Sequence, residues 1–168
     1  MTEVIGGACA RWLRTGDVLD LRGDLGSGKT TFVRGLIRAL GVDSPVQSPT
    51  YTLGSCYLTP SGLRVDHLDA YFGAKERAYL IDGGAEAFGI DSACVVEWPE
   101  KIEDLLPEDR LSITFDYGDD ESVRTLRWEG LGPRGHELAQ HLTDFAASLY
   151  LTSLGHDGSD LTTEAAHA

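Results

Sequence analysis

Apolar side chains recur at helical spacing in several stretches of this chain. Residues three and four positions apart share one face of a helix, so such stretches predict helices that cover a core. The stretches with this pattern are residues 3–14, 31–40, 133–151, a weaker one at 73–88 and a short one at 100–105. Gly41 follows the second stretch and Pro133 opens the third, at positions where helices commonly stop and start.

Other stretches have the β-branched, aromatic or continuous apolar character of strands. They are residues 18–21, 50–58, 63–68, 93–96, 111–117 and 123–128. Residues 93–96 are apolar throughout, which is typical of a strand buried on both faces. Turn residues at 59–62 and 118–120 join two pairs of strands as hairpins. We therefore expect an α/β fold with a P-loop NTPase-like mixed β-sheet flanked by helices.

Length, charge and cysteine content narrow the class of protein. The 168 residues favour a single domain, which we place at 1–151, and the polar, acidic stretch 152–168 is expected to be a disordered tail. A formal charge of −13 disfavours unaided binding to nucleic acid, because phosphates are neutralised by clustered Lys and Arg. The three cysteines, which lie far apart in apolar patterns, are expected to be small buried hydrophobes in a reducing compartment. No secretory signal or membrane-length apolar segment is present, so we expect a cytoplasmic location and no membrane contact.

Residues 23–30 read GDLGSGKT and fit the phosphate-loop pattern G-x-x-x-x-G-K-[ST]. Glycines let the backbone curl so that N–H groups converge on phosphate oxygens, and the following helix adds the positive end of its dipole. In this motif Lys29 reaches the β- and γ-phosphates and the Thr30 hydroxyl coordinates Mg²⁺. The pattern itself does not separate ATP from GTP. The second half of the chain has no N/T-K-x-D guanine-reading pattern, which favours adenine.

Carboxylates at the ends of expected strands are candidates for a magnesium nucleotide site. Glu97 closes the apolar run 93–96. It could hold Mg²⁺ through water, orient the attacking water or be an ordinary strand-end carboxylate. Asp69 is a second candidate, with the alternative that it is a polar hairpin residue together with Asp66 and His67.

Four further residues are candidates for the surroundings of these groups. Asp24 lies inside the phosphate loop, where its carboxylate is expected to brace the loop. Ser48 and Thr50 lie in the loop after the nucleotide helix, a region that often senses the γ-phosphate in P-loop proteins. Trp98 follows Glu97 directly, so it is either a core residue or a neighbour of the site.

Four segments occur in one order along the chain: GDLGSGKTTFVRGL at 23–36, SPTYTL at 48–53, HLDAY at 67–71 and VEWPE at 96–100. Together they resemble the bacterial TsaE family, also called YjeE, over residues 2–130. The resemblance implies a small P-loop ATPase of tRNA threonylcarbamoyladenosine biosynthesis that binds ATP and Mg²⁺ and hydrolyses ATP slowly. It implies that the chain acts with TsaD and TsaB as a turnover factor, while those partners perform the transfer and hold the tRNA.

The resemblance also implies roles for individual residues. Lys29, Thr50, Asp69 and Glu97 would be catalytic, and Thr30 and Glu97 would bind the metal ion. The nucleotide would be held by Gly23, Asp24, Leu25, Gly26, Ser27, Gly28, Lys29, Thr30 and Thr31, with Trp98 packed beside it.

The chain departs from the family pattern in two places. The family has a strand before its first helix, and this chain begins at about the residue where that helix is expected to start. Either translation starts upstream in the native gene or the sheet lacks one edge strand, so the contacts to adenine stay open. The family motif D-x-Y-R reads Asp69-Ala70-Tyr71-Phe72 here, and Phe72 cannot donate the hydrogen bonds of an arginine. Two other functions remain open: a nucleotide-gated protein-binding module without meaningful hydrolysis, and a small-molecule kinase.

Overall fold

A mixed sheet of six strands forms the centre of the molecule, in the order β2-β3-β4-β1-β5-β6. The computed structural model describes residues 1–49, 54–72, 74–79, 88, 90–118, 120 and 123–153. The strands are β1 (Val18–Arg22), β2 (Gly54–Leu58), β3 (Arg64–Asp69), β4 (Ala93–Glu97), β5 (Arg110–Tyr117) and β6 (Arg124–Leu131). Strands β3, β4, β1 and β5 run parallel, whereas β2 and β6 at the two edges run antiparallel to their neighbours. The α/β fold with a mixed sheet, predicted from the sequence, is confirmed.

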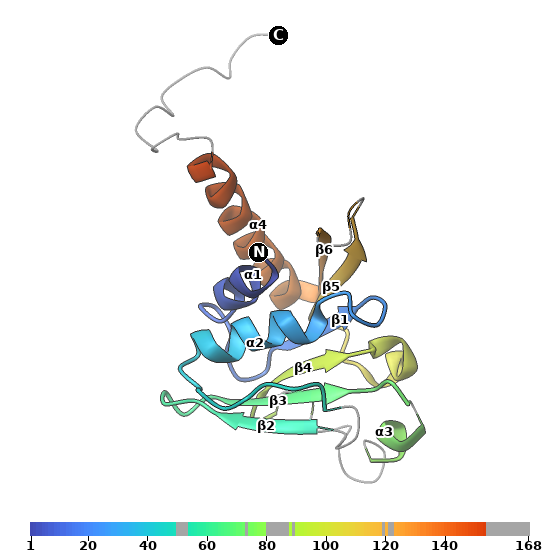
Figure 1. The fold of residues 1–168 in the computed structure, drawn as a ribbon. Coiled ribbons are helices and arrows are strands. Elements are labelled where there is room, and N and C mark those ends of the chain that lie inside the picture. Colours follow the sequence, from blue (N-terminus) through green and yellow to red (C-terminus); the bar gives the residue numbers. More distant parts are fainter. Residues whose placement is uncertain are drawn as a thin grey trace.

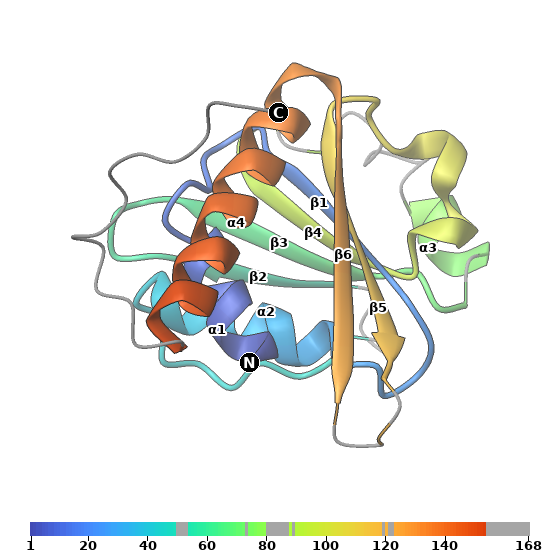
Figure 2. The same ribbon diagram turned by 90° about the horizontal axis from the view of Figure 1, so that it is seen from above.

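Helices cover one face of this sheet. The helical elements are α1 (Thr2–Cys9), α2 (Lys29–Ala39), α3 (Ala74–Tyr79), α4 (Gly132–Ser153) and the 3-10 turns η3 (Pro99–Lys101) and η4 (Glu103–Leu105). Figures 1 and 2 show α1, α2 and α4 on the same side of the strands. Phe32 of α2 and Leu142 of α4 belong to the main core there, together with Leu19 of β1. A smaller core that contains Val96 and Ile102 lies on the opposite face, because successive strand residues point to opposite sides.

Helices α1 and α2 approach each other to backbone contact. A Cβ atom at Gly6 of α1 would lie 2.1 Å from the carbonyl oxygen of Phe32. One at Gly35 of α2 would lie 2.1 Å from the carbonyl oxygen of Glu3. These two glycines therefore permit the close packing that fixes α2, the helix that follows the phosphate loop.

The first helix is shorter than the stretch 3–14 predicts, because it ends at Cys9. Beyond Cys9 the chain continues in i→i+3 turns, in which the N–H groups of Arg11 and Trp12 donate to the carbonyl oxygens of Ala8 and Cys9. The Arg134 guanidinium donates to the carbonyl oxygen of Trp12 at 2.5 Å and to the Asp17 carboxylate at 2.7 and 2.8 Å. The chain after Cys9 therefore turns to meet α4, although its apolar spacing is still helical.

Two smaller predictions are also corrected. The helix expected at 100–105 is two 3-10 turns, separated at Ile102, whose φ of −135° is outside the helical region and whose side chain is fully buried. Cys9 and Cys94 are buried as expected, but Cys56 is exposed on the edge strand β2. All three are free thiols.

Some predictions fall on residues that the structure does not describe. Thr50, the glycine pair at 83–84 and residues 154–168 of the expected tail are among them. Helix α4 itself continues to Ser153. Within the described part of the chain, no helix has both the length and the apolar character that crossing a bilayer requires.

Candidate functional site

The phosphate loop connects β1 to α2 at the carboxyl end of β1. Gly23, Gly26 and Gly28 have φ angles of 134°, 76° and 111°, a region that residues with side chains rarely adopt. A Cβ atom at Gly23 would also lie 2.3 Å from the carbonyl oxygen of Phe115. Gly28 is the N-cap of α2, so the unpaired N–H groups and the positive dipole end of that helix face the loop. The backbone thus has the geometry of an anion-binding loop.

Lys29 begins α2, and its side chain folds back beneath the loop. Its Nζ atom donates to the carbonyl oxygens of Gly23 at 2.6 Å and Asp24 at 3.0 Å. It also lies 4.0 Å from the centroid of the Trp98 ring, within cation–π distance. Burial lowers the pKa of Lys29 below its usual value, and nearby carboxylates, first among them Glu97, oppose that shift. A phosphate in the loop would stabilise the charged ammonium, so this lysine suits an anionic ligand.

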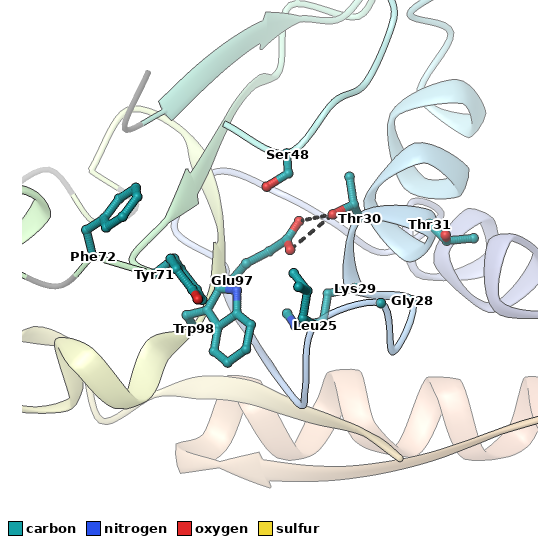
Figure 3. A pocket seen from close by; sticks show the side chains of 11 residues that line it. Leu25, Gly28, Lys29, Thr30, Thr31, Ser48, Tyr71, Phe72, Glu97 and Trp98 are labelled. Carbon is teal, nitrogen blue, oxygen red and sulfur yellow. Dashed lines mark hydrogen bonds between the residues drawn. The ribbon is translucent and has the colours of Figure 1, made fainter. Parts of the chain in front are cut away.

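Glu97 ends β4 and lies beside Leu21 of β1, which places it next to the phosphate loop. The Thr30 hydroxyl, also drawn in Figure 3, lies 2.9 Å from Oε1 and 3.1 Å from Oε2 of this carboxylate and donates to it. Both groups supply the oxygen ligands that Mg²⁺ prefers. Among the described residues, no group of three or more His, Cys, Asp or Glu side chains is arranged to hold a metal ion. A Mg²⁺ ion in a phosphate site takes most of its ligands from phosphates and water, so Thr30 and Glu97 fit one.

His67 lies in the β2–β3 hairpin, in agreement with its interpretation as a polar hairpin residue, but it also has a contact that the sequence did not predict. The side chain is fully buried and its Nε2 atom lies 2.9 Å from Oε1 of Glu97. Alternation along β3 places His67 and Asp69 on one face, which is a signal present in the sequence. The pairing of β3 with β4, which brings His67 to Glu97, is not readable from it.

Asp69 ends β3 and is paired directly with Glu97 in the β3–β4 register. Its Oδ1 atom accepts the N–H of Tyr71 at 2.9 Å, and its Oδ2 atom accepts the hydroxyl of Ser48 at 2.5 Å. Asp69 therefore connects the end of β3 to the loop that contains Ser48 and continues into Thr50. The predicted place of Thr50 near the γ-phosphate stays a prediction, since Thr50 is outside the described residues.

A cavity of about 400 Å³ opens beside these groups (Figure 3). The predicted site residues that line it are Leu25, Gly26, Gly28, Lys29, Thr30, Thr31, Glu97 and Trp98. Gly23, Asp24, Ser27 and Asp69 are not among the lining residues. Asp24 stabilises the loop through its backbone carbonyl, which accepts from Lys29 Nζ and from the Ser27 N–H, and its exposed carboxylate interacts electrostatically with Lys29.

Aromatic side chains border one side of the cavity. Trp98 has a φ of 59°, and it is the one non-glycine residue with positive φ in the described part of the chain. Such a conformation costs on the order of 1 kcal/mol and is common at functional sites. The Trp98 ring meets Tyr71 edge-on at 5.1 Å, and Tyr71 meets Phe72 at 5.3 Å. Phe72, which replaces the family arginine, thus contributes exposed apolar surface to the cavity.

The β5–β6 hairpin holds the phosphate loop from another side, a contact that the sequence did not reveal. The Tyr117 hydroxyl donates to the carbonyl oxygen of Leu25 at 2.5 Å. Arg124 donates to the carbonyl oxygen of Gly26 at 3.4 Å, and its guanidinium lies 4.4 Å from the centre of the Tyr117 ring. Neither residue belongs to a motif, and the contact depends on the pairing of β5 with β1.

The fold and the loop geometry place the chain in the phosphate-loop class of α/β proteins. The sequence model described as "Threonylcarbamoyl adenosine biosynthesis protein TsaE" matches residues 1–126. A relative from Bacillus subtilis (strain 168), named tRNA threonylcarbamoyladenosine biosynthesis protein TsaE, is 38% identical over 143 residues, which cover 84% of this chain and 87% of the relative. A relative of the same name from Haemophilus influenzae is 41% identical over 113 residues, 67% of this chain and 71% of the relative.

The crystal structure of Bacillus subtilis YdiB superposes with a TM-score of 0.72 at 32% identity, covering 86% of this chain and 88% of YdiB. The chain belongs to the TsaE family.

Proposed function

We propose that this chain binds Mg-ATP in the cavity beside the phosphate loop and hydrolyses it slowly, as a turnover factor in tRNA threonylcarbamoyladenosine biosynthesis. The observation that carries the proposal is the convergence of three groups on one cavity: Lys29, the Thr30 hydroxyl and the Glu97 carboxylate. The names of the TsaE relatives support the pathway.

Each group has a chemical task in this proposal. The loop N–H groups and Lys29 bind the phosphates, and Thr30 and Glu97 hold the metal ion, directly or through water. When bound, Mg²⁺ neutralises charge on the phosphates. Glu97 would also orient the attacking water. Asp69 would keep the loop before Thr50 close to the site, where Thr50 would meet the γ-phosphate. Trp98 limits access of solvent to Lys29.

The family and the charge of the chain support a proposal about its partners. We propose that the chain acts in the cytoplasm with TsaD and TsaB, and that tRNA reaches it only through that complex. The formal charge of −13 supports contact with protein, since direct contact with tRNA would require a basic surface.

The test is a reconstituted modification reaction followed over many turnovers with the chain present, absent or substituted. Lys29→Ala should weaken Mg-ATP binding at least about ten-fold, because a charge-assisted contact to phosphate is lost, and should stop repeated turnover. Lys101→Ala, which removes an exposed lysine of η3, is the matched control and should behave as the unsubstituted chain. Full activity of Lys29→Ala would contradict the proposed site.

Hydrolysis is tested separately from binding. Glu97→Ala should retain nucleotide binding within about ten-fold and lose phosphate release, as expected of a group that acts mainly on the transition state. Repeated turnover with the non-hydrolysable analogue AMPPNP in place of ATP would instead support the nucleotide-gated binding module.

A further inference from the structure

His67 lies behind the carboxylate of Glu97, outside the cavity. Its side chain is fully buried, and it is not among the residues that line the cavity. Its Nε2 atom is 2.9 Å from Oε1 of Glu97, the same oxygen that lies 2.9 Å from the Thr30 hydroxyl. Glu97 is therefore held by one donor from β3 and one from the phosphate loop, which together determine the direction of its carboxylate.

The direction of this hydrogen bond follows from the acceptor. A carboxylate has no proton to donate, so Nε2 carries the hydrogen and donates it to Glu97. The other ring nitrogen, Nδ1, is buried without a hydrogen-bond partner among the described residues. The polar contact of His67 is thus the hydrogen bond from Nε2 to Glu97. Because the side chain is buried and has this one specific polar contact, its role is expected to be exerted on Glu97.

We propose that His67 is a positioning residue that keeps the Glu97 carboxylate aimed at the metal and water positions beside Thr30. This inference rests on the hydrolysis proposed above. His67 has no access to the cavity, so it acts through Glu97 and touches neither nucleotide nor water itself. Loss of a residue that holds a metal ligand by a hydrogen bond, without touching the metal itself, typically lowers activity by about 10- to 100-fold.

Two substitutions of His67 distinguish the effect of its hydrogen bond to Glu97 from the effect of losing the imidazole ring. In His67→Gln the amide nitrogen ends the same number of bonds from Cα as Nε2, so it can donate to Glu97. In His67→Asn the amide nitrogen takes the place of Nδ1 and does not reach Glu97. We expect His67→Asn to lower kcat for ATP hydrolysis at least about ten-fold with KM within about two-fold, and His67→Gln to recover most of that loss.

Val65→Ala is the control for a purely structural effect. Val65 is fully buried on the same face of β3, two residues before His67, and belongs to the main core. Its truncation should lower stability and leave kcat unchanged. Equal kcat for His67→Asn and the unsubstituted chain, or equal losses in His67→Asn and Val65→Ala, would overturn the inference.

A double-mutant cycle tests the hydrogen bond between His67 and Glu97 separately from ATP hydrolysis. Phosphate release by the unsubstituted chain tests the proposed function alone. Urea unfolding of His67→Asn, Glu97→Ala and the double variant tests the bond between the two residues. We expect non-additivity of about ten-fold in the folding equilibrium constant, because residues in direct contact couple. Additive effects would overturn the inference whatever the hydrolysis result.

Discussion

At the scale of single residues, Thr30 couples the phosphate loop to β4, because its hydroxyl donates to the Glu97 carboxylate at 2.9 Å. Thr30→Ala removes the hydroxyl and leaves the helix N-terminus intact. We expect the Mg²⁺ concentration for half-maximal AMPPNP binding to rise about ten-fold, as loss of one oxygen contact to a cation predicts. Thr30→Ser keeps the hydroxyl and should stay within about two-fold. Titration with Mg²⁺ at a fixed concentration of fluorescent AMPPNP measures both, and equal behaviour of the two variants would exclude a role for the hydroxyl.

The phosphate loop was the predictable part of the site, because its residues are contiguous in the sequence. The positive φ angles of Gly23, Gly26 and Gly28 and the position of Lys29 at the start of α2 belong to one continuous segment, so the sequence motif contained them. His67 was missed because its partner is 30 positions away on another strand. No periodicity within β3 shows which side chain of β4 it will meet.

At the scale of elements, adjacent glycines in α1 differ in their surroundings. A Cβ at Gly6 would meet a backbone oxygen at 2.1 Å, whereas one at Gly7 would have ordinary contacts at 3.5 Å. Gly6→Ala should therefore force α1 away from α2 and destabilise the protein by roughly 2 kcal/mol or more, as overpacking against backbone does. Gly7→Ala should stabilise it by about 0.5–1 kcal/mol, because alanine loses less entropy in a helix. Urea unfolding of the pair measures the contrast, and similar values for both would contradict the close packing.

The β5–β6 hairpin gives a second prediction at this scale. Tyr117→Phe removes the hydroxyl that donates to the Leu25 carbonyl and keeps the ring beneath Arg124. We expect nucleotide affinity to fall by about three- to ten-fold, because the lost hydrogen bond orders the loop. A net contribution of about 1 kcal/mol from one hydrogen bond corresponds to a change of this size. Arg127→Ala removes a salt bridge to Asp116 in the same hairpin and should leave the affinity unchanged. If both variants bind nucleotide as the unsubstituted chain does, the hairpin does not order the loop.

Element boundaries were less predictable than element types. The apolar spacing of residues 3–14 is helical throughout, yet α1 stops at Cys9, and Arg134 binds the carbonyl of Trp12 and the carboxylate of Asp17 in the segment that follows. This contact comes from α4, more than a hundred positions away. A helix period reports which face is apolar, but it does not report which backbone groups a distant side chain will hold.

At the scale of the whole molecule, the sequence contained the fold class but not the strand order. Six strand-like runs and three long helical stretches predict an α/β sheet, and both observed hairpins were expected. The insertion of β1 between β4 and β5 was not readable, and this placement brings Glu97 on one side and Tyr117 on the other to the phosphate loop. The site is therefore a consequence of topology, since its residues come from segments that are distant in the chain.

The buried thiols make the whole fold sensitive to alkaline pH. Burial, with a smaller effect of the Asp17 charge, raises the pKa of Cys9 to about 12 from the usual 9.0. Above pH 9 the unfolded chain loses a proton that the folded chain keeps, so this contribution to stability is complete below pH 9 and is lost as pH rises through about 12. At pH 10.5 the loss from Cys9 is on the order of 2 kcal/mol.

Cys9→Ala should therefore reduce the fall in the free energy of unfolding between pH 8 and 10.5, as measured by urea titration with reductant present. Ile5→Val removes core volume from the same helix without removing a titratable group, so it should lower stability equally at both pH values. The pH-dependent part of the difference then belongs to the thiol. An unchanged slope in Cys9→Ala would mean that the thiolate is accommodated without unfolding, and that the core around α1 admits water at high pH.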